Sequence, residues 1–229
     1  MVIRVKKMRF GIIILSVVNL LLGIMLIIQS NNEVQEVMSV EENMMKGKLA
    51  ITFDDGPNPL YTGRLLEGLK SRNVKATFFV VGKKAEENPE LIQRMQEDGH
   101  IIGNHTYSHI QLTQGNKSQF VEDIRKTNEI IKQITGDDVA FIRPPYGIWD
   151  KKYEKELNMF PVLWTVDPKD WCSQNADAVT RAVVNKVEEN DIILLHDDYD
   201  TSVTAALAII DILQKQGYQF VTVDEILFD

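Results

Sequence analysis

Two adjacent carboxylates are the first residues in the chain whose types and positions suggest chemistry. Asp54 and Asp55 closely follow a short apolar run, residues 49–51, and Gly56 and Pro57 then break the backbone. This pattern predicts a strand that ends in a turn carrying two acids. Like charges at neighbouring positions repel, so such a pair usually needs a compensating cation. An Asp before Gly is also common in ordinary turns, and this stretch alone leaves both interpretations open.

A pair of histidines supplies a second candidate group. His105 and His109 are four residues apart, a spacing that on a helical turn places both imidazoles on one face. Two histidines and a carboxylate form the usual three-ligand set of a catalytic zinc site, which keeps one position open for water. The same spacing also occurs without a metal. Of the other two histidines, His196 follows an apolar run, whereas His100 begins one and is interpreted as structural.

The elements that must position these groups are strands alternating with helices. The apolar, β-branched runs predict strands at residues 48–53, 76–81, 100–103, 140–142, 162–166, 192–195 and 220–223. Helical periodicity predicts helices at residues 60–71, 89–98, 118–135 (with Ser118 as N-cap), 176–189 and 204–216. Strict alternation implies parallel strands with right-handed crossovers. Periodicity alone does not distinguish an open doubly wound sheet from a barrel in the style of the (β/α)8 fold.

Polar side chains follow five of the predicted strands at the same end. They are Asp54 and Asp55, His105, Arg143, Asp167 and His196. In α/β folds the carboxyl ends of the strands are where active sites are built. Residues 143–147 also contain two prolines, which stiffen the loop, and a rigid loop can fix a backbone N–H as an oxyanion site requires. The sequence therefore predicts one site at this edge.

The N-terminal part of the chain differs from the rest. Residues 10–28 carry no charge and are almost all apolar, and four basic residues precede them. A helix of this length matches the ~30 Å hydrocarbon core of a bilayer, and the basic residues place its start in the cytoplasm. A cleavable signal peptide would have a shorter apolar region and a small-residue cleavage site. We therefore expect a cytoplasmic tip and transmembrane anchor (residues 1–28), a polar linker (29–47) and an extracellular domain (48–229).

The net charge of the chain limits the classes of molecule that it is expected to bind. The chain has 229 residues and a formal net charge of −8. Phosphate binding needs a basic surface, so this balance argues against nucleic acid. Cys172 is the single cysteine, which excludes a disulfide within one chain.

Five motifs in this order resemble those of the polysaccharide deacetylases, carbohydrate esterase family four. They are residues 52–57, 105–109, 143–146, 167–171 and 194–196. The resemblance covers residues 48 to about 227. It implies an α/β fold, a distorted (β/α)7 barrel with a groove at the carboxyl ends of its strands, here preceded by the single transmembrane helix.

The resemblance also implies a role for each polar residue. A divalent metal, with zinc expected and cobalt as an alternative, would be held by three residues, Asp55, His105 and His109. Asp54 would be the general base and Arg143 its charged partner. His196 would be the general acid, tuned by Asp167. Trp171 and Leu194 would line the pocket for the acetyl methyl group, and the backbone N–H of Tyr146 would bond the oxyanion.

These roles imply metal-dependent removal of acetyl groups from an N-acetylhexosamine polymer by activated water. The outward topology points to cell-wall peptidoglycan at the membrane. Within the same class, the alternatives are a chitooligosaccharide or exopolysaccharide deacetylase and an acetylxylan esterase. A non-catalytic glycan-binding surface protein on the same scaffold would be expected to lose its base or acid, whereas Asp54 and His196 are both present. A glycosidase would use two carboxylates and leave the histidine pair without a role.

Overall fold

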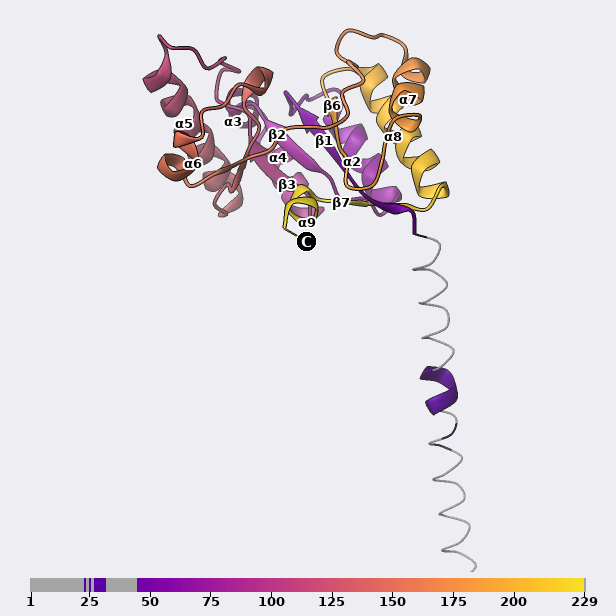
Figure 1. Cartoon of the computed structure of the whole chain (residues 1–229). Coiled ribbons are helices and arrows are strands. Elements are labelled where there is room, and N and C mark those ends of the chain that lie inside the picture. The colour runs from indigo at the N-terminus through magenta and orange to yellow at the C-terminus, as the bar shows by residue number, and fades with distance from the viewer. Residues whose placement is uncertain (1–22, 24, 26, 32–44, 229) are drawn as a thin grey trace, which may run out of the picture. The chain divides into compact units, whose positions relative to one another are not determined.

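A computed structural model describes residues 23, 25, 27–31 and 45–228 (Figure 1). Within these residues no helix is both long enough and apolar enough to cross a membrane. The predicted anchor, residues 10–28, and the predicted linker, residues 29–47, lie largely outside them. The chain divides into two units, Met1–Met45 and Lys46–Asp229, and the second contains all of the strands and helices discussed below.

The described residues form one sheet in which every strand pair is parallel. Its strands are β1 (Gly47–Asp54), β2 (Thr77–Val80), β3 (Ile101–Asn104), β4 (Phe141–Ile142), β5 (Phe160–Pro161), β6 (Ile192–His196) and β7 (Tyr218–Val221). The order in space is β5-β4-β3-β2-β1-β6, and β7 pairs with the first half of β1. The predicted α/β class is confirmed, but the sheet is an open half-barrel rather than a (β/α)7 barrel. The segment after β5 meets β6 at an isolated bridge between Val166 and Ile193, with backbone hydrogen bonds of 2.9–3.2 Å around it, and does not form a regular strand there.

Helices flank the strands on both sides (Figure 1). Their bounds are α2 (Thr62–Ser71), α3 (Gly82–Glu87), α4 (Pro89–Glu97), α5 (Lys117–Thr135), α6 (Lys152–Leu157), α7 (Ala176–Val184), α8 (Asp200–Lys215) and α9 (Val223–Leu227), with a 3₁₀ turn at Pro145–Gly147. In Figure 1, α7 and α8 lie side by side on one flank, and α3, α5 and α6 lie on the other. The sequence did not predict α3, α6 or α9, which have only five or six residues and so are too short to show a repeated helical pattern.

Alternation along β1 separates the core from the site. Leu49, Ile51 and Phe53 pack into the large cluster beneath the helices. Because successive side chains of a strand point to opposite faces, the residues between them, including Thr52 and Asp54, face the inside of the half-barrel. β6 follows the same rule, so His196, directly opposite Asp54 in the register, also faces inward.

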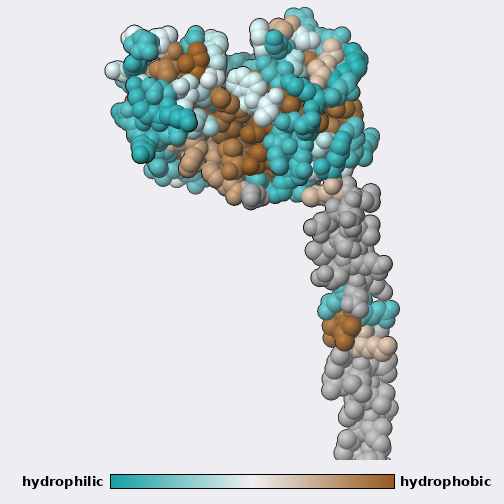
Figure 2. All heavy atoms as spheres, viewed as in Figure 1, coloured by the Kyte–Doolittle hydropathy of each residue, from teal (hydrophilic) through white to brown (hydrophobic). Residues whose placement is uncertain are grey.

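Apolar residues also pack together on the inner face of the half-barrel. A second cluster contains Phe79, Phe141, Val162, Ile192 and Val223, the last being the first residue of α9. Phe160 and Phe228 extend this cluster to the surface, with ring centroids 5.4 Å apart. Figure 2 shows hydrophilic flanks with apolar residues reaching the surface between them.

One predicted strand and the limits of two predicted helices are wrong. Residues 162–166 are not a strand, because the carbonyl groups of Val162 and Leu163 accept hydrogen bonds from Arg143 instead of from a neighbouring strand. The N-cap of α5 is Asn116 rather than Ser118. α7 ends at Val184 rather than at residue 189.

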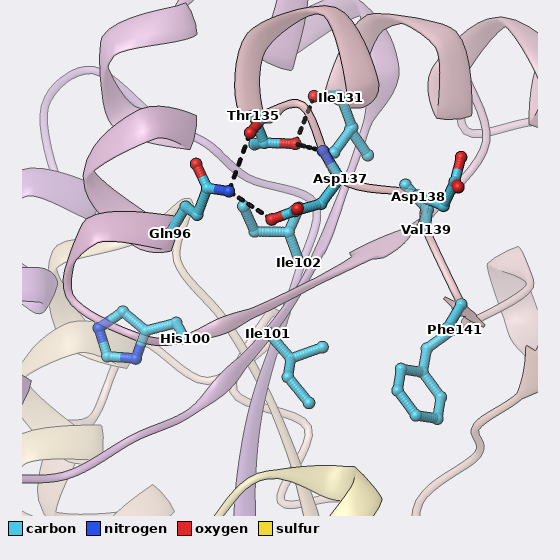
Figure 3. A pocket seen from close by; sticks show the side chains of 11 residues that line it. Gln96, His100, Ile101, Ile102, Ile131, Thr135, Asp137, Asp138, Val139 and Phe141 are labelled. Atoms are coloured by element: carbon cyan, nitrogen blue, oxygen red, sulfur yellow. Dashed lines mark hydrogen bonds between the residues drawn. The ribbon is translucent and has the colours of Figure 1, made fainter.

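His100 lies at the opposite edge of the sheet from the carboxylates. Figure 3 shows it beside a cavity of about 240 Å³ that is lined also by Ile101, Ile131 and Phe141. Its Nδ1 accepts a hydrogen bond of 3.1 Å from the backbone N–H of Ala76. Burial lowers the pKa of His100 to about 4, with a further lowering by the charge of Lys75 and an opposing effect of Asp98. These contacts fit the structural role expected for this residue.

We predict that His100 makes the fold sensitive to mild acid. An unfolded histidine has a pKa near 6.5, so between pH 6.5 and 4 the unfolded chain binds a proton that the folded chain does not. The free energy of unfolding should therefore fall over this window by up to ~1.4 kcal/mol per pH unit from this group. His100→Asn, whose amide oxygen can accept the Ala76 hydrogen bond, should flatten the dependence. Urea unfolding at several pH values gives the free energy of unfolding of the wild type and of His100→Asn. The same pH dependence of this free energy in both proteins would contradict the prediction.

Candidate active site

The carboxyl ends of β1, β3 and β6 bring the predicted polar residues together. Asp54 ends β1 and pairs in register with His196 at the end of β6. His105 directly follows β3, and Arg143 directly follows β4. Together with the loops that follow β4 and β5, these ends enclose a cavity of about 470 Å³.

Arg143 is fully buried and all its contacts hold other parts of the site. Its Nη1 donates to Asp54 Oδ1 at 2.8 Å and to Thr52 Oγ1 at 2.7 Å. Nε and Nη2 donate to backbone carbonyls in the segment after β5, and the guanidinium lies over the ring of Phe79, 4.2 Å from its centroid. Burial lowers the pKa of Arg143 while Asp54 opposes the change, but arginine remains charged at neutral pH. The predicted pairing of Asp54 with Arg143 is present.

The backbone of Arg143 fixes the protonation of His105. Nδ1 of His105 lies 2.6 Å from the Arg143 carbonyl oxygen. A carbonyl only accepts, so Nδ1 carries a proton, and Nε2 is the nitrogen left to act as a ligand when the ring is neutral. A protein partner of this kind is typical of histidines that bind metals.

The histidine pair is formed by a loop and not by the helical turn expected from its spacing. Thr106 and His109 have φ of 61° and 56°, which a helix does not allow. Asn104, which is buried, stabilises the loop by accepting a hydrogen bond from Thr106 N–H at 2.7 Å. The rings of His105 and His109 nevertheless converge, with centroids 4.9 Å apart.

Asp55 completes a cluster that suits a metal ion. Its φ of 71° turns it away from the strand, and its Oδ1 lies 3.3 Å from His105 Nε2 and 3.2 Å from His109 Nε2. One ligand atom from each residue lies within 4.8 Å of the other two.

The electrostatics of this cluster call for a cation between its members. Asp55 Oδ1 is buried and has no hydrogen bond of good geometry, while the lone pair of His105 Nε2 faces it. Burial raises the pKa of the Asp55 carboxyl, but the adjacent His105 and His109 lower it by more, first through hydrogen bonding and then through charge, and hold that pKa well below its usual range. Two nitrogens and a carboxylate oxygen are ordinary zinc ligands. The residues present therefore fit a divalent metal.

His196 is held by Asp170 rather than by Asp167, to which its tuning was assigned. Asp170 Oδ1 accepts from His196 Nδ1, and Asp170 Oδ2 accepts from His196 N–H, both at 2.9 Å. Asp167 instead accepts a hydrogen bond of 2.7 Å from Lys169 N–H, which forms the turn that directs Asp170 inward. Burial alone lowers the pKa of His196, but Asp170, with help from Asp54 and Asp55, raises it to about 9.

The remaining predicted residues line the same cavity. Its walls contain Tyr146, Asp167, Trp171 and Leu194, as predicted, together with Trp164 and Tyr199, which the sequence did not single out. Tyr146 has φ of 62°, and its ring meets that of His109 edge-on at 5.1 Å. Among the described residues, no hydrogen bond uses the N–H of Tyr146.

Gly56 is required by close packing beside the metal cluster. A Cβ at this position would overlap the carboxylate of Asp197. Asp197 is fully buried and accepts a hydrogen bond from Thr62 Oγ1. Burial raises its pKa to about 7. The residue after His196 thus packs against the residue after Asp55, which ties the ends of β6 and β1 together.

The cavity in Figure 3 does not offer comparable chemistry. Gln96 donates to the carbonyl oxygen of Thr135 at 3.0 Å and to the carboxylate of Asp137, so these polar groups satisfy one another. Its remaining walls are mainly apolar. The catalytic residue types collect at the other edge.

A family model described as polysaccharide deacetylase matches residues 41–162, more than half of the chain. The chain belongs to the polysaccharide deacetylase family. It is similar to the peptidoglycan-N-acetylmuramic acid deacetylase PdaC of Bacillus subtilis, with 40% identity over 178 residues that cover 78% of this chain and 38% of PdaC. The solved structure of PdaC matches with a TM-score of 0.76, 39% identity and coverage of 80% of this chain and 91% of that one.

Other members of the polysaccharide deacetylase family share the similarity. A peptidoglycan-N-acetylglucosamine deacetylase of Bacillus cereus is 41% identical over 184 residues, which cover 77% of this chain and 67% of the relative. A family 4 acetyl xylan esterase of Clostridium thermocellum, solved with a cobalt ion, is 35% identical, with a TM-score of 0.72 and coverage of 78% and 89%. The chain spans about two fifths of the length of PdaC.

We predict that the pKa of His196 depends on Asp170 and not on Asp167. In Asp170→Asn the negative charge against Nδ1 is lost, so the pKa should fall from about 9 toward the ordinary value near 6.5. Asp167→Asn is the matched control and should leave it close to the wild-type value. NMR titration of the imidazole signals in chelator-treated protein measures both variants. A fall in the pKa of His196 that is larger in Asp167→Asn than in Asp170→Asn would contradict the assignment.

Proposed function

We propose that the chain is a metal-dependent N-deacetylase of an N-acetylhexosamine polymer, with peptidoglycan as the preferred substrate. The observation that carries this proposal is the complete set of groups in one cavity: the Asp55–His105–His109 cluster, Asp54 held by Arg143, and His196 held by Asp170. Amide hydrolysis needs each of these functions, namely activation of water, acceptance of a proton and protonation of the leaving amine.

A divalent metal on Asp55, His105 and His109, with zinc preferred and cobalt as the alternative, would polarise the acetyl carbonyl and make water a nucleophile near neutral pH. The protein's part is to orient the three ligand atoms. Hydrogen bonding of His105 Nδ1 to the Arg143 carbonyl does this for one of them.

Asp54 accepts the proton of the attacking water. Its Oδ1 accepts a hydrogen bond from Arg143, which fixes the direction of the carboxylate. Its Oδ2 lies 3.9 Å from His105 Nε2, next to the metal cluster, and remains available for the proton. Because one oxygen holds the side chain in place and the other reacts, the base needs no reorganisation during the step.

His196 donates the proton that allows the amine to leave. Asp170 occupies Nδ1, so Nε2 is the nitrogen near the metal cluster, 4.0 Å from Asp55 Oδ2. When the tetrahedral intermediate collapses, the carbon–nitrogen bond breaks and the nitrogen takes the proton from Nε2. The products are acetic acid, which loses its proton to solvent as acetate, and the free amine of the sugar, and the proton held by Asp54 restores His196.

The negative oxygen of the intermediate would be stabilised by the backbone N–H of Tyr146, whose positive φ comes from a proline-stiffened turn. Removing one such donor typically costs about 10²–10³ in rate. Trp171 and Leu194, which line the cavity, would contact the acetyl methyl group.

The choice of peptidoglycan rests on two supports. Relatives that are about 40% identical are named for peptidoglycan N-acetylmuramic acid or N-acetylglucosamine. The apolar residues 10–28 and the basic residues before them would anchor the chain with its deacetylase domain on the cell-wall side. Chitooligosaccharides and acetylated xylan are the alternatives, supported by relatives of those names.

Acetate release from defined polymers tests the proposal. The full chain, treated with chelator and reloaded with zinc, should release acetate from peptidoglycan faster than from chitooligosaccharides or acetylated xylan. The chelated protein should release none, since the proposed nucleophile needs the metal. If zinc-dependent release occurs with acetylated xylan only, the substrate is an O-acetyl ester and not an N-acetyl amide. Tight zinc binding without release from any polymer would instead favour a non-catalytic glycan-binding protein.

A further inference from the structure

The loop after β6, together with the first residue of α8, is held by the rest of the fold at three of its four positions. This loop, residues 197–200 with Asp200 of α8 included, contains three aspartates and Tyr199. Asp197 binds Thr62, Asp198 pairs with Lys84, and Asp200 pairs with Arg64 at 2.7 Å. Asn58 also donates to Asp198, at 3.2 Å. Four contacts thus hold the loop against α2, α3 and the segment between β1 and α2.

Among residues 197–200, Tyr199 is the one whose side chain makes no hydrogen bond or ion pair with the described part of the chain. Its backbone is fixed as the N-cap of α8, with its carbonyl accepting from Val203 N–H at 3.1 Å. The residue is 45% exposed and lines the catalytic cavity. Within the described part of the chain, that side chain makes no hydrogen bond and no ring contact. An exposed ring on a rigid backbone is a preorganised binding surface, because little further ordering is needed when a ligand arrives.

The cavity has room and surfaces for more than an acetamido group. Its volume of about 470 Å³ lies within the ~300–1,000 Å³ typical of pockets that enclose drug-sized ligands. Tyr146 is already packed on His109, and Trp171 comes from the loop that also carries Asp170. Tyr199 comes from a different loop, the one that follows β6, the strand that bears His196. Sugar rings present apolar C–H faces, and aromatic rings are suited to cover them.

We propose that Tyr199 is a specificity-determining residue that stacks on the sugar unit next to the one that loses its acetyl group. The occupant is thus an oligosaccharide of N-acetylhexosamine units rather than a single sugar. The ring contributes to the binding of the chain and not to the chemical step, because the metal cluster, the base and the acid are all supplied by other residues. This inference rests on the proposed function, since it assigns a neighbour to the reacting sugar.

The test compares substrates of two lengths on the zinc-loaded full chain. Acetate release is measured with a tetramer of N-acetylglucosamine and with the monosaccharide, for wild type, Tyr199→Ala and Tyr199→Phe. Tyr199→Ala should raise the KM for the tetramer about tenfold, in line with the loss of one ring stack, with little change in kcat and a much smaller change for the monosaccharide. Tyr199→Phe keeps the ring and should resemble the wild type.

Two results would overturn the proposal: an unchanged KM for the tetramer in Tyr199→Ala, or an equal rise for both substrates. Inhibition by acetohydroxamate, a small metal-binding probe, reports on the integrity of the metal cluster in each variant. If the wild type releases no acetate from either substrate or from peptidoglycan, the proposed function fails; whenever the tetramer is not deacetylated, calorimetric binding of the tetramer decides the inference by itself. Weaker binding in Tyr199→Ala than in Tyr199→Phe supports it, and equal or undetectable binding in all three proteins overturns it.

Discussion

The buried guanidinium of Arg143 is the constraint on which the site depends. Its side chain holds Asp54 Oδ1, and its carbonyl oxygen orders His105, so one residue positions both the proposed base and a proposed metal ligand. A charge with no solvent exposure is tolerated only when it is paired and fully hydrogen-bonded. Breaking such a pair typically costs about 3–5 kcal/mol of folding stability. The interaction that positions the site therefore also stabilises the fold.

The open half-barrel explains why Arg143 has these contacts. Residues 162–166 leave β5 and cross toward β6, and a closed ladder there would occupy the carbonyls of Val162 and Leu163. Because the ladder is absent, those carbonyls accept from the guanidinium and complete its hydrogen bonding. The irregular segment therefore satisfies a buried cation and at the same time leads to the turn that carries Asp170.

Much of this arrangement could be predicted from the sequence, because it follows from local rules. Alternation in β1 and β6 fixes which residues face inward, and parallel strands bring Asp54, His105, Arg143 and His196 to one edge. The failures have a common cause in long-range contacts. Residues 162–166 have the composition of a strand, but Arg143, twenty positions away, determines their conformation. Asp170 and Asp167 are equally suitable by sequence, and only the folded backbone shows that Asp170 is the one that contacts His196. Tyr199 lies outside the motifs, and its position follows from four separate ion pairs and hydrogen bonds made by its neighbours.

The division of labour between the two adjacent carboxylates is the central claim, since Asp54 is assigned to the proton and Asp55 to the metal. Measuring zinc affinity and acetate release together on Asp54→Asn tests it most directly. The variant keeps an oxygen for Arg143, so it should bind zinc within about threefold of the wild type while acetate release falls at least ~10²-fold, as expected for loss of a general base. Loss of zinc from Asp54→Asn, or activity close to wild type, would contradict the account.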